Sequence, residues 1–254
     1  MTLRYIILGA DYESYEEDFF NKFMDNVRFV SNYITRKIRS CKVETDGTFN
    51  MISVYITKAS DSCSLKAENV LAVKVHVSEN SMINYLKMKD ENTRFEYYLS
   101  ILEKGYSIAL NHKNIPQKLL LTIHQEFRQG GYLNEHLFKS MQLKELGIGI
   151  KLFHSLSSYD YKLKLIVFNN KKELLGKGVV YQTFPDEILF DKNVKHVVIN
   201  NENLVVTDFL NKPQFVCNLS DLSNGIIKSK CVDDNTRKYI YNEQNAEKFE
   251  RLKW

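Results

Sequence analysis

The chain has 254 residues, of which 44% are hydrophobic and 26% are charged, an ordinary balance for a globular protein that is long enough to bury a large core. Its net charge of +4 is mild, and this argues against a dedicated nucleic-acid-binding domain, which usually carries one strongly basic face. No apolar run approaches the roughly 18 residues of a membrane-spanning helix. The apolar run Leu3–Leu8 is followed closely by the acidic Asp11 and is too short for the apolar region of a signal peptide, so we expect no signal peptide and a cytoplasmic protein.

The four cysteines are widely separated in the sequence, and none belongs to a Cys-x-x-Cys pair. Such pairs are typical of zinc sites and of thioredoxin-like redox motifs, so we expect neither. A chain of this size does not need a disulfide framework. The four residues are Cys41, Cys63, Cys217 and Cys231.

The N-terminal stretch predicts a strand followed by a long helix. Leu3–Leu8 is apolar on both faces, which is typical of a central strand. Ser14–Arg39 carries an apolar side chain at every third or fourth position, so it predicts a helix with one apolar face. Ser14 and Glu17 have the spacing of a capping box, in which each side chain binds a free backbone N–H of the first turn.

Two alternating stretches, Met51–Thr57 and Val70–Val77, predict half-buried strands on either side of a polar loop at Lys58–Glu68. The first 80 residues therefore predict a β-α-β-β unit. Three helical patterns follow: Asn92–Lys104 closed by Gly105, a helix from Asn114-Ile115-Pro116 to Gln129-Gly130-Gly131, and Leu133–Leu146 stopped by Gly147.

The C-terminal part changes to a period of two, which predicts an antiparallel meander. Its expected strands are Tyr161–Phe168, Leu174–Thr183, Val194–Ile199 and Leu204–Thr207. From Ser229 onward the sequence is charged and weakly patterned, and we expect a surface helix or a frayed tail. The predicted fold class is α+β, in one domain of residues 1–254. Any division into two lobes, 1–154 and 155–254, would fall at Ser155–Asp160.

Motifs for catalysis are incomplete. His124-Gln125-Glu126 lacks the second histidine of a zinc protease, so His124 reads as a partly buried structural residue. Gly176-Lys177-Gly178 lies in a predicted strand rather than before a helix, so it indicates a bulge or twist and not a phosphate loop. Phe184-Pro185-Asp186-Glu187 lacks the following acid-x-Lys of a metal-dependent nuclease and reads as a strand end with a turn. We therefore predict no catalytic, cofactor-binding or metal-binding residues and no cofactor.

The densest acidic stretch follows the first predicted strand. Glu16 and Glu17 suit a helix N-terminus, where acids complement the helix dipole. Asp11 and Glu13 are not explained in this way, and they follow a strand at the edge where α/β sheets place ligands. Tyr12 lies between them, and tyrosine is enriched at protein interfaces. We predict partner binding by Asp11, Tyr12, Glu13, Glu16 and Glu17.

Three stretches, Arg94–Tyr106, Ile123–Tyr132 and Thr183–Glu187, are similar to sequences of bacterial immunity proteins that neutralise polymorphic or contact-dependent growth-inhibition toxins. The resemblance spans roughly residues 90 to 190. It implies a cytoplasmic, non-enzymatic α+β protein that binds the catalytic domain of a cognate toxin and blocks its active site. Inhibitors of nucleases are often strongly acidic, whereas this chain is +4, so any acidic complementarity must be local. The first candidate is the stretch from Asp11 to Asp18.

Two alternatives remain open. One is a metal-dependent enzyme that acts on nucleic acid or nucleotides with a site assembled from scattered residues. The other is a nucleic-acid-binding module, for which Arg36, Lys37, Arg39 and Lys42 are the candidate contacts. The sequence leaves the identity of the partner and the oligomeric state undetermined.

Overall fold

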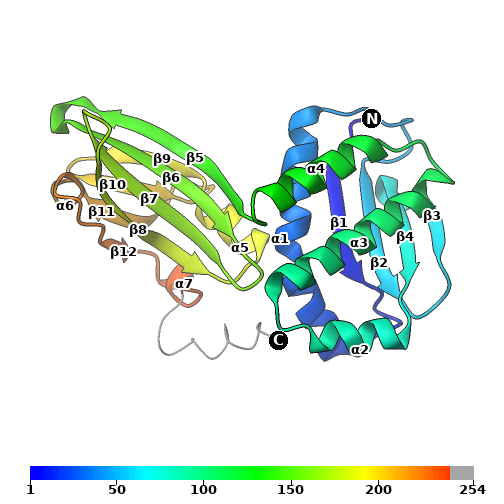
Figure 1. The fold of residues 1–254 in the computed structure, drawn as a ribbon. Coiled ribbons are helices and arrows are strands. Elements are labelled where there is room, and N and C mark those ends of the chain that lie inside the picture. The colour runs from blue at the N-terminus through cyan, green and yellow to red at the C-terminus, as the bar shows by residue number, and fades with distance from the viewer. Residues whose placement is uncertain (241–254) are drawn as a thin grey trace. The chain divides into compact units, whose positions relative to one another are not determined.

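The computed structural model describes residues 1–240, and their contacts form two compact units of an α+β protein (Figure 1). Unit 1 is residues 1–134, and unit 2 begins at Glu135. The stretch Ser155–Asp160, where any division into lobes was expected to fall, contains the end of β6 (Ile148–Leu156) and the turn into β7 (Tyr161–Asn169), two strands paired along their length. The boundary therefore falls at the start of a β-sheet rather than inside one.

Unit 1 contains a four-stranded mixed sheet in the order β1-β2-β4-β3. β1, β2 and β4 are parallel, and β3 is antiparallel to β4. The prediction that the first strand is central was wrong, because β1 lies at one end of this order. The polar stretch predicted as a loop contains β3, whose side chains are mostly exposed, so it lacks an apolar pattern. The bounds are β1 (Tyr5–Ala10), β2 (Met51–Thr57), β3 (Ser62–Lys66) and β4 (Val70–His76).

Helix α1 (Glu17–Cys41) covers the outer edge of β1. The backbone N–H of Ile6 donates to Thr35 Oγ1 at 3.0 Å, and the N–H of Leu8 donates to Ser31 Oγ at 3.0 Å. These bonds are buried, and two hydroxyls one helical turn apart take the place of a neighbouring strand. The sequence of β1 is apolar on both faces, like that of a central strand, because α1 buries its outer edge.

The predicted apolar stripe of α1 is confirmed, but its capping box is not. The helix begins three residues late, after Glu16, and no side chain caps it. Ser14 instead donates its hydroxyl to Asp11 Oδ2 at 3.0 Å and lies 2.9 Å from Thr57 Oγ1. Its hydroxyl is therefore used at the end of the sheet. The stripe is buried at Phe23, Val27, Val30, Ile34 and Ile38.

Three further helices complete unit 1: α2 (Glu79–Lys87), which the sequence did not predict, α3 (Glu91–Leu110) and α4 (Gln117–Gln129). α4 agrees with the expected bounds. α3 does not stop at Gly105, because this glycine serves packing rather than termination. A Cβ atom placed on Gly105 would lie 2.6 Å from Cγ1 of Val54 on β2. The absence of a side chain lets the helix lie close against the sheet.

Unit 2 contains two antiparallel four-stranded sheets in the orders β5-β6-β7-β8 and β12-β11-β10-β9. The rings of Tyr181 and Phe215 stack at 4.5 Å and join the two sheets. The meander prediction is confirmed. The bounds not given above are β5 (Asn134–Leu143), β8 (Leu174–Thr183), β9 (His196–Asn200), β10 (Asn203–Thr207), β11 (Pro213–Asn218), β12 (Ser229–Cys231), α5 (Glu187–Asn193), α6 (Leu219–Ser223) and α7 (Asp234–Arg237).

The helix predicted at Leu133–Leu146 was wrong, because the stretch forms β5 and a short 3₁₀ turn, η2 (Lys144–Leu146). Its apolar residues have the spacing of a helix, but in the structure Leu133 and Leu137 are 71% and 51% exposed, and pairing with β6 decides the outcome. Gly147 does end this stretch, with a left-handed φ of 64°. From Ser229 onward the described residues include β12 and α7, and residues 241–254 of the expected tail lie outside the described part.

Gly176 and Gly178 on β8 are close-packing positions. The register of β7 against β8 shifts on both sides of them, which agrees with the predicted bulge or twist. A Cβ atom on Gly176 would collide with the carbonyl of Gly225, and one on Gly178 would lie 3.0 Å from Cβ of Ile227. The glycines therefore admit a neighbouring chain segment.

Candidate functional site

The first candidate site lies at the carboxyl end of the parallel strands of unit 1. Asp11 follows β1, Thr57 ends β2, and Lys74 is near the end of β4. Asp11 Oδ2 accepts hydrogen bonds from Lys74 Nζ at 2.8 Å, Thr57 Oγ1 at 2.9 Å and Ser14 Oγ at 3.0 Å. Burial acts to raise the pKa of Asp11, but these bonds outweigh it and lower the pKa below its ordinary value of 3.8. The carboxylate is ionised and held inside unit 1.

The other four predicted partner-binding residues are exposed. Tyr12 is 69% exposed, and its ring lies edge-on against Phe20, with the centroids 5.5 Å apart. Glu13, Glu16 and Glu17 surround the start of α1 with exposed carboxylates. We call Tyr12, Glu13, Glu16 and Glu17 the α1 acidic surface. Asp11 does not belong to it, because its side chain is only 12% exposed and is already paired with Lys74.

Tyr15, beside this surface, is half-buried. Its ring packs against Phe19 at 4.8 Å. Burial raises the pKa of its hydroxyl to about 12, so the hydroxyl stays protonated at neutral pH. Lys58 Nζ lies 5.6 Å from the centre of the Tyr15 ring. The polar chemistry at this end of the sheet is therefore that of a paired carboxylate and a neutral phenol.

A second polar cluster joins α3 to α4, and the sequence reasoning did not predict it. Arg128 donates from Nε and Nη2 to both carboxylate oxygens of Glu96 at 2.9 Å, and its Nη2 also lies 3.0 Å from Glu103 Oε1. His124 Nδ1 lies 3.0 Å from the same Glu103 oxygen, and Tyr132 donates its hydroxyl to Glu96. The sequence does contain a pattern that could have indicated this cluster. Positions 96 and 103 share one face of a helix, and positions 124 and 128 share one face of the next helix.

The electrostatics of this α3–α4 cluster are those of a closed structural network. Hydrogen bonds from Arg128 lower the pKa of Glu96, and one from His124 lowers that of Glu103. Burial, and then hydrogen bonding to Glu96, raises the pKa of Tyr132 to about 12. His124 is fully buried, with its Nε2 3.3 Å from the Tyr106 hydroxyl. The groups bind one another through hydrogen bonds and ion pairs, so the cluster clamps two helices together.

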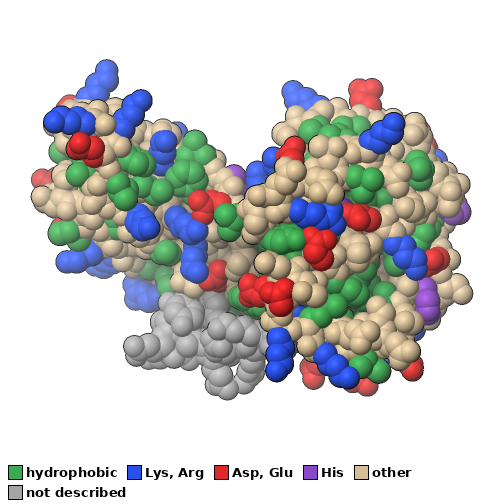
Figure 2. Space-filling view, viewed as in Figure 1, with side chains coloured by type: hydrophobic (Ala, Val, Ile, Leu, Met, Phe, Trp, Pro, Cys, Tyr) green, Lys and Arg blue, Asp and Glu red, His purple; other side chains and the backbone are tan. Residues whose placement is uncertain are grey.

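The cations proposed for nucleic-acid contact are mostly engaged within unit 1. Arg36 donates to Asn134 Oδ1 at 3.2 Å, Lys37 pairs with Glu126 at 2.7 Å, and Arg39 donates to a backbone carbonyl at 3.0 Å. Lys42 is exposed just after α1. On the face shown in Figure 2, basic side chains of unit 1 are scattered among acidic and neutral ones. The cations do not form one free basic stripe on α1.

Residues 1–240 contain no group of three or more His, Cys, Asp and Glu residues placed to hold a metal ion. Within the same residues, no helix is both long enough and apolar enough to cross a membrane. The fold and these clusters define a two-unit α+β protein. No protein-family model, curated protein or solved structure matches the chain.

Proposed function

We propose that the chain is a non-enzymatic interaction protein that binds a partner protein through the α1 acidic surface. The observation that carries the proposal is Tyr12, a large side chain that is 69% exposed but held by its ring contact with Phe20. A fixed aromatic side chain loses little conformational freedom on binding, and tyrosine is enriched among residues that dominate binding energy. The carboxylates of Glu13, Glu16 and Glu17 favour a partner with a basic surface.

The specific form of the proposal is an immunity protein that occludes the active site of a cognate bacterial toxin. The resemblance of residues 94–106, 123–132 and 183–187 to such proteins supports it. A toxin that cleaves nucleic acid has a basic active site, which would complement a local acidic surface even though the whole chain is +4. No cofactor is required, because occlusion is steric and electrostatic.

The test is co-expression of the chain with each protein encoded beside it on its chromosome, followed by purification of the tagged chain. We expect one stoichiometric partner, and we expect that partner to be lethal when it is expressed alone and harmless with the chain. A partner that stays lethal in the presence of the chain would overturn the immunity function. Purification of the chain with none of the neighbouring proteins would overturn it as well.

A further inference from the structure

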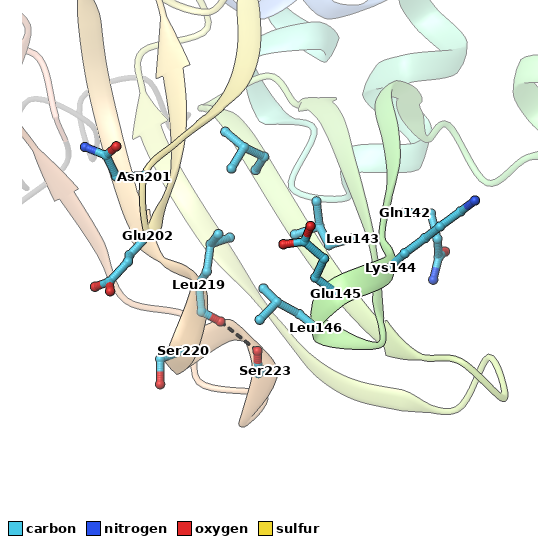
Figure 3. Close-up of a pocket in the computed structure, with 11 residues that line it drawn as sticks. Gln142, Leu143, Lys144, Glu145, Leu146, Asn201, Glu202, Leu219, Ser220 and Ser223 are labelled. Carbon is cyan, nitrogen blue, oxygen red and sulfur yellow. Dashed lines mark hydrogen bonds between the residues drawn. The ribbon is translucent and has the colours of Figure 1, made fainter.

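Unit 2 contains a cleft of about 910 Å³ between two turns of its sheets. The connection from β5 to β6 provides one wall, with Leu143, Glu145 and Leu146. β9 and the start of α6 provide the other, with Ile199 and Leu219 (Figure 3). The volume lies in the range of sites that bind small organic molecules, roughly 300 to 1,000 Å³.

The floor and walls of this cleft offer apolar contact to a ligand. Leu146 is 41% exposed and Ile199 is 39% exposed, so both leave much of their apolar surface in water. Leu219 also lines the cleft and is largely buried. A concave site with exposed apolar side chains gains free energy when a ligand displaces the water.

Three charged residues line the cleft, Lys144, Glu145 and Glu202, and their side chains differ in direction. In Figure 3 the carboxylate of Glu145 projects to the side of the turn on which Leu143 and Leu146 lie, whereas the ammonium end of Lys144, which also lines the cleft, extends to the opposite side of the turn. The carboxylate of Glu202, on the opposite rim, points outward. Within residues 1–240, Glu145 makes no side-chain hydrogen bond or ion pair. Its negative charge is therefore available to a ligand.

Both walls are held in place by hydrogen bonds. The Gly147 N–H donates to the Lys144 carbonyl at 3.2 Å, and Gln142 donates to Asn170 Oδ1 at 3.3 Å. On the other wall, the Leu219 N–H donates to the carbonyl of Glu202 at 2.9 Å. The Leu219 carbonyl in turn accepts from Ser223 Oγ at 2.9 Å (Figure 3). A site fixed before binding loses less entropy when a ligand enters.

We propose that this cleft binds a small amphipathic organic cation. Its alkyl or aromatic body would lie against Leu146, Ile199 and Leu219, and its ammonium or guanidinium group would pair with Glu145. A neutral apolar molecule would remove water from the Glu145 carboxylate without replacing those hydrogen bonds, which is costly. An anion would be repelled by the same charge. This site is in unit 2, and it stands independently of the α1 acidic surface.

Three probes of equal chain length test the proposal: octylammonium, octanol and octanoate, each titrated into the full chain with backbone amide NMR shifts as the readout. We expect octylammonium to bind about tenfold more tightly than octanol, and octanoate to bind most weakly. Glu145→Gln should remove the preference for the cation and leave octanol binding unchanged. Glu202→Gln is the matched control and should change none of the three affinities. Leu146→Asn should weaken octylammonium and octanol alike.

Several outcomes would overturn the proposal. Equal affinity for octylammonium and octanol would show that Glu145 plays no role in binding. The same conclusion would follow if the Glu145→Gln variant kept the preference for the cation while its amide shifts outside the cleft matched those of the wild type. No shift of cleft amides at millimolar octylammonium would remove the site. Shifts of the cleft amides with a short peptide of alternating leucine and lysine, but none with octylammonium, would assign the cleft to a protein partner instead.

Discussion

Thr35 on α1 and Ile6 on β1 exchange two hydrogen bonds: the Ile6 N–H donates to the Thr35 hydroxyl, and that hydroxyl donates to the Ile6 carbonyl, both at 3.0 Å. A side chain thus makes the pair of bonds that a neighbouring strand would make. We expect Thr35→Val, which keeps the shape but leaves a buried N–H and a buried carbonyl unpaired, to lower the free energy of unfolding by about 1–3 kcal/mol. Urea unfolding measures this change.

The control for this prediction is Thr122→Val on α4. Thr122 is exposed and bonds only to a carbonyl of its own helix, so its replacement should change the free energy of unfolding by less than about 0.5 kcal/mol. Equal effects at both positions would show that the edge contact contributes nothing specific.

Gly105→Ala tests the close approach of α3 to β2. Alanine in place of glycine normally stabilises a helix by about 1 kcal/mol. Here the added methyl group would meet Val54 at 2.6 Å, and we expect a net destabilisation of about 1–3 kcal/mol from overpacking. Combining it with Val54→Ala should recover part of the loss, because the second change removes the clashing atoms. A more stable Gly105→Ala variant would contradict the packing role.

The α3–α4 cluster predicts a dependence of stability on pH. The pKa of Glu103 is lowered, first by its hydrogen bond to His124, below its ordinary value of 4.5. A carboxyl group whose pKa is lower in the folded chain stabilises the fold at pH values above its pKa in the unfolded chain. This contribution is lost as the pH falls from 4.5 toward the pKa of the folded chain. Glu103→Gln should therefore be less stable than wild type at about pH 6, and the difference should shrink toward about pH 3. Chemical unfolding at both pH values measures it.

A matched variant for this cluster is Glu126→Gln on α4, whose carboxylate pairs with Lys37 at the surface. Exposed pairs of this kind contribute about 0–1 kcal/mol, so its effect should be small at both pH values. A difference between wild type and Glu103→Gln that stays constant across this pH range would contradict the assignment.

For the α1 acidic surface, we expect Tyr12→Ala to weaken binding of the partner by about 2 kcal/mol, mainly through faster dissociation. Glu17→Lys should slow association, and more strongly at low salt, because a charge at the rim acts on the encounter. Surface plasmon resonance separates the two rates. Glu91→Lys is the matched control, since Glu91 is an exposed acid in the first turn of α3.

Unchanged rates for both Tyr12→Ala and Glu17→Lys would show that the partner binds elsewhere. Asp11 is not a suitable position for this test. Its replacement would break bonds to Lys74, Thr57 and Ser14 and would disturb the end of the sheet.

Periodicity predicted elements well where one face decides burial. β2, β4, α4 and the strands from β7 to β10 lie where the patterns placed them. Periodicity gave wrong predictions where a contact with another helix or strand decides the role of a residue. β1 looks central because Ser31 and Thr35 cover its edge, and Gly105 looks like a helix end although Val54 requires it. No local pattern encodes such contacts.

The candidate site divides in the same way. Exposure of Glu13, Glu16 and Glu17 agrees with their charge in the sequence, whereas the 69% exposure of Tyr12 is unusual for an aromatic side chain. The engagement of Asp11 could not be predicted, because Thr57 and Lys74 reach it from strands far along the chain. The walls of the cleft in unit 2 come from distant parts of the sequence, so only the fold brings Glu145 near Leu219.

Because hydroxyl groups of α1 cover the outer edge of β1, a further strand could pair with the sheet of unit 1 only at its other edge. Among the described residues, β3 pairs with β4 alone, so its far side is the remaining strand edge of this sheet. Its sequence, Ser62-Cys63-Ser64-Leu65-Lys66, is short and polar with a terminal lysine, features that discourage uncontrolled pairing between copies. Unit 1 therefore resists polymerisation by two different means, a helix on one side and composition on the other.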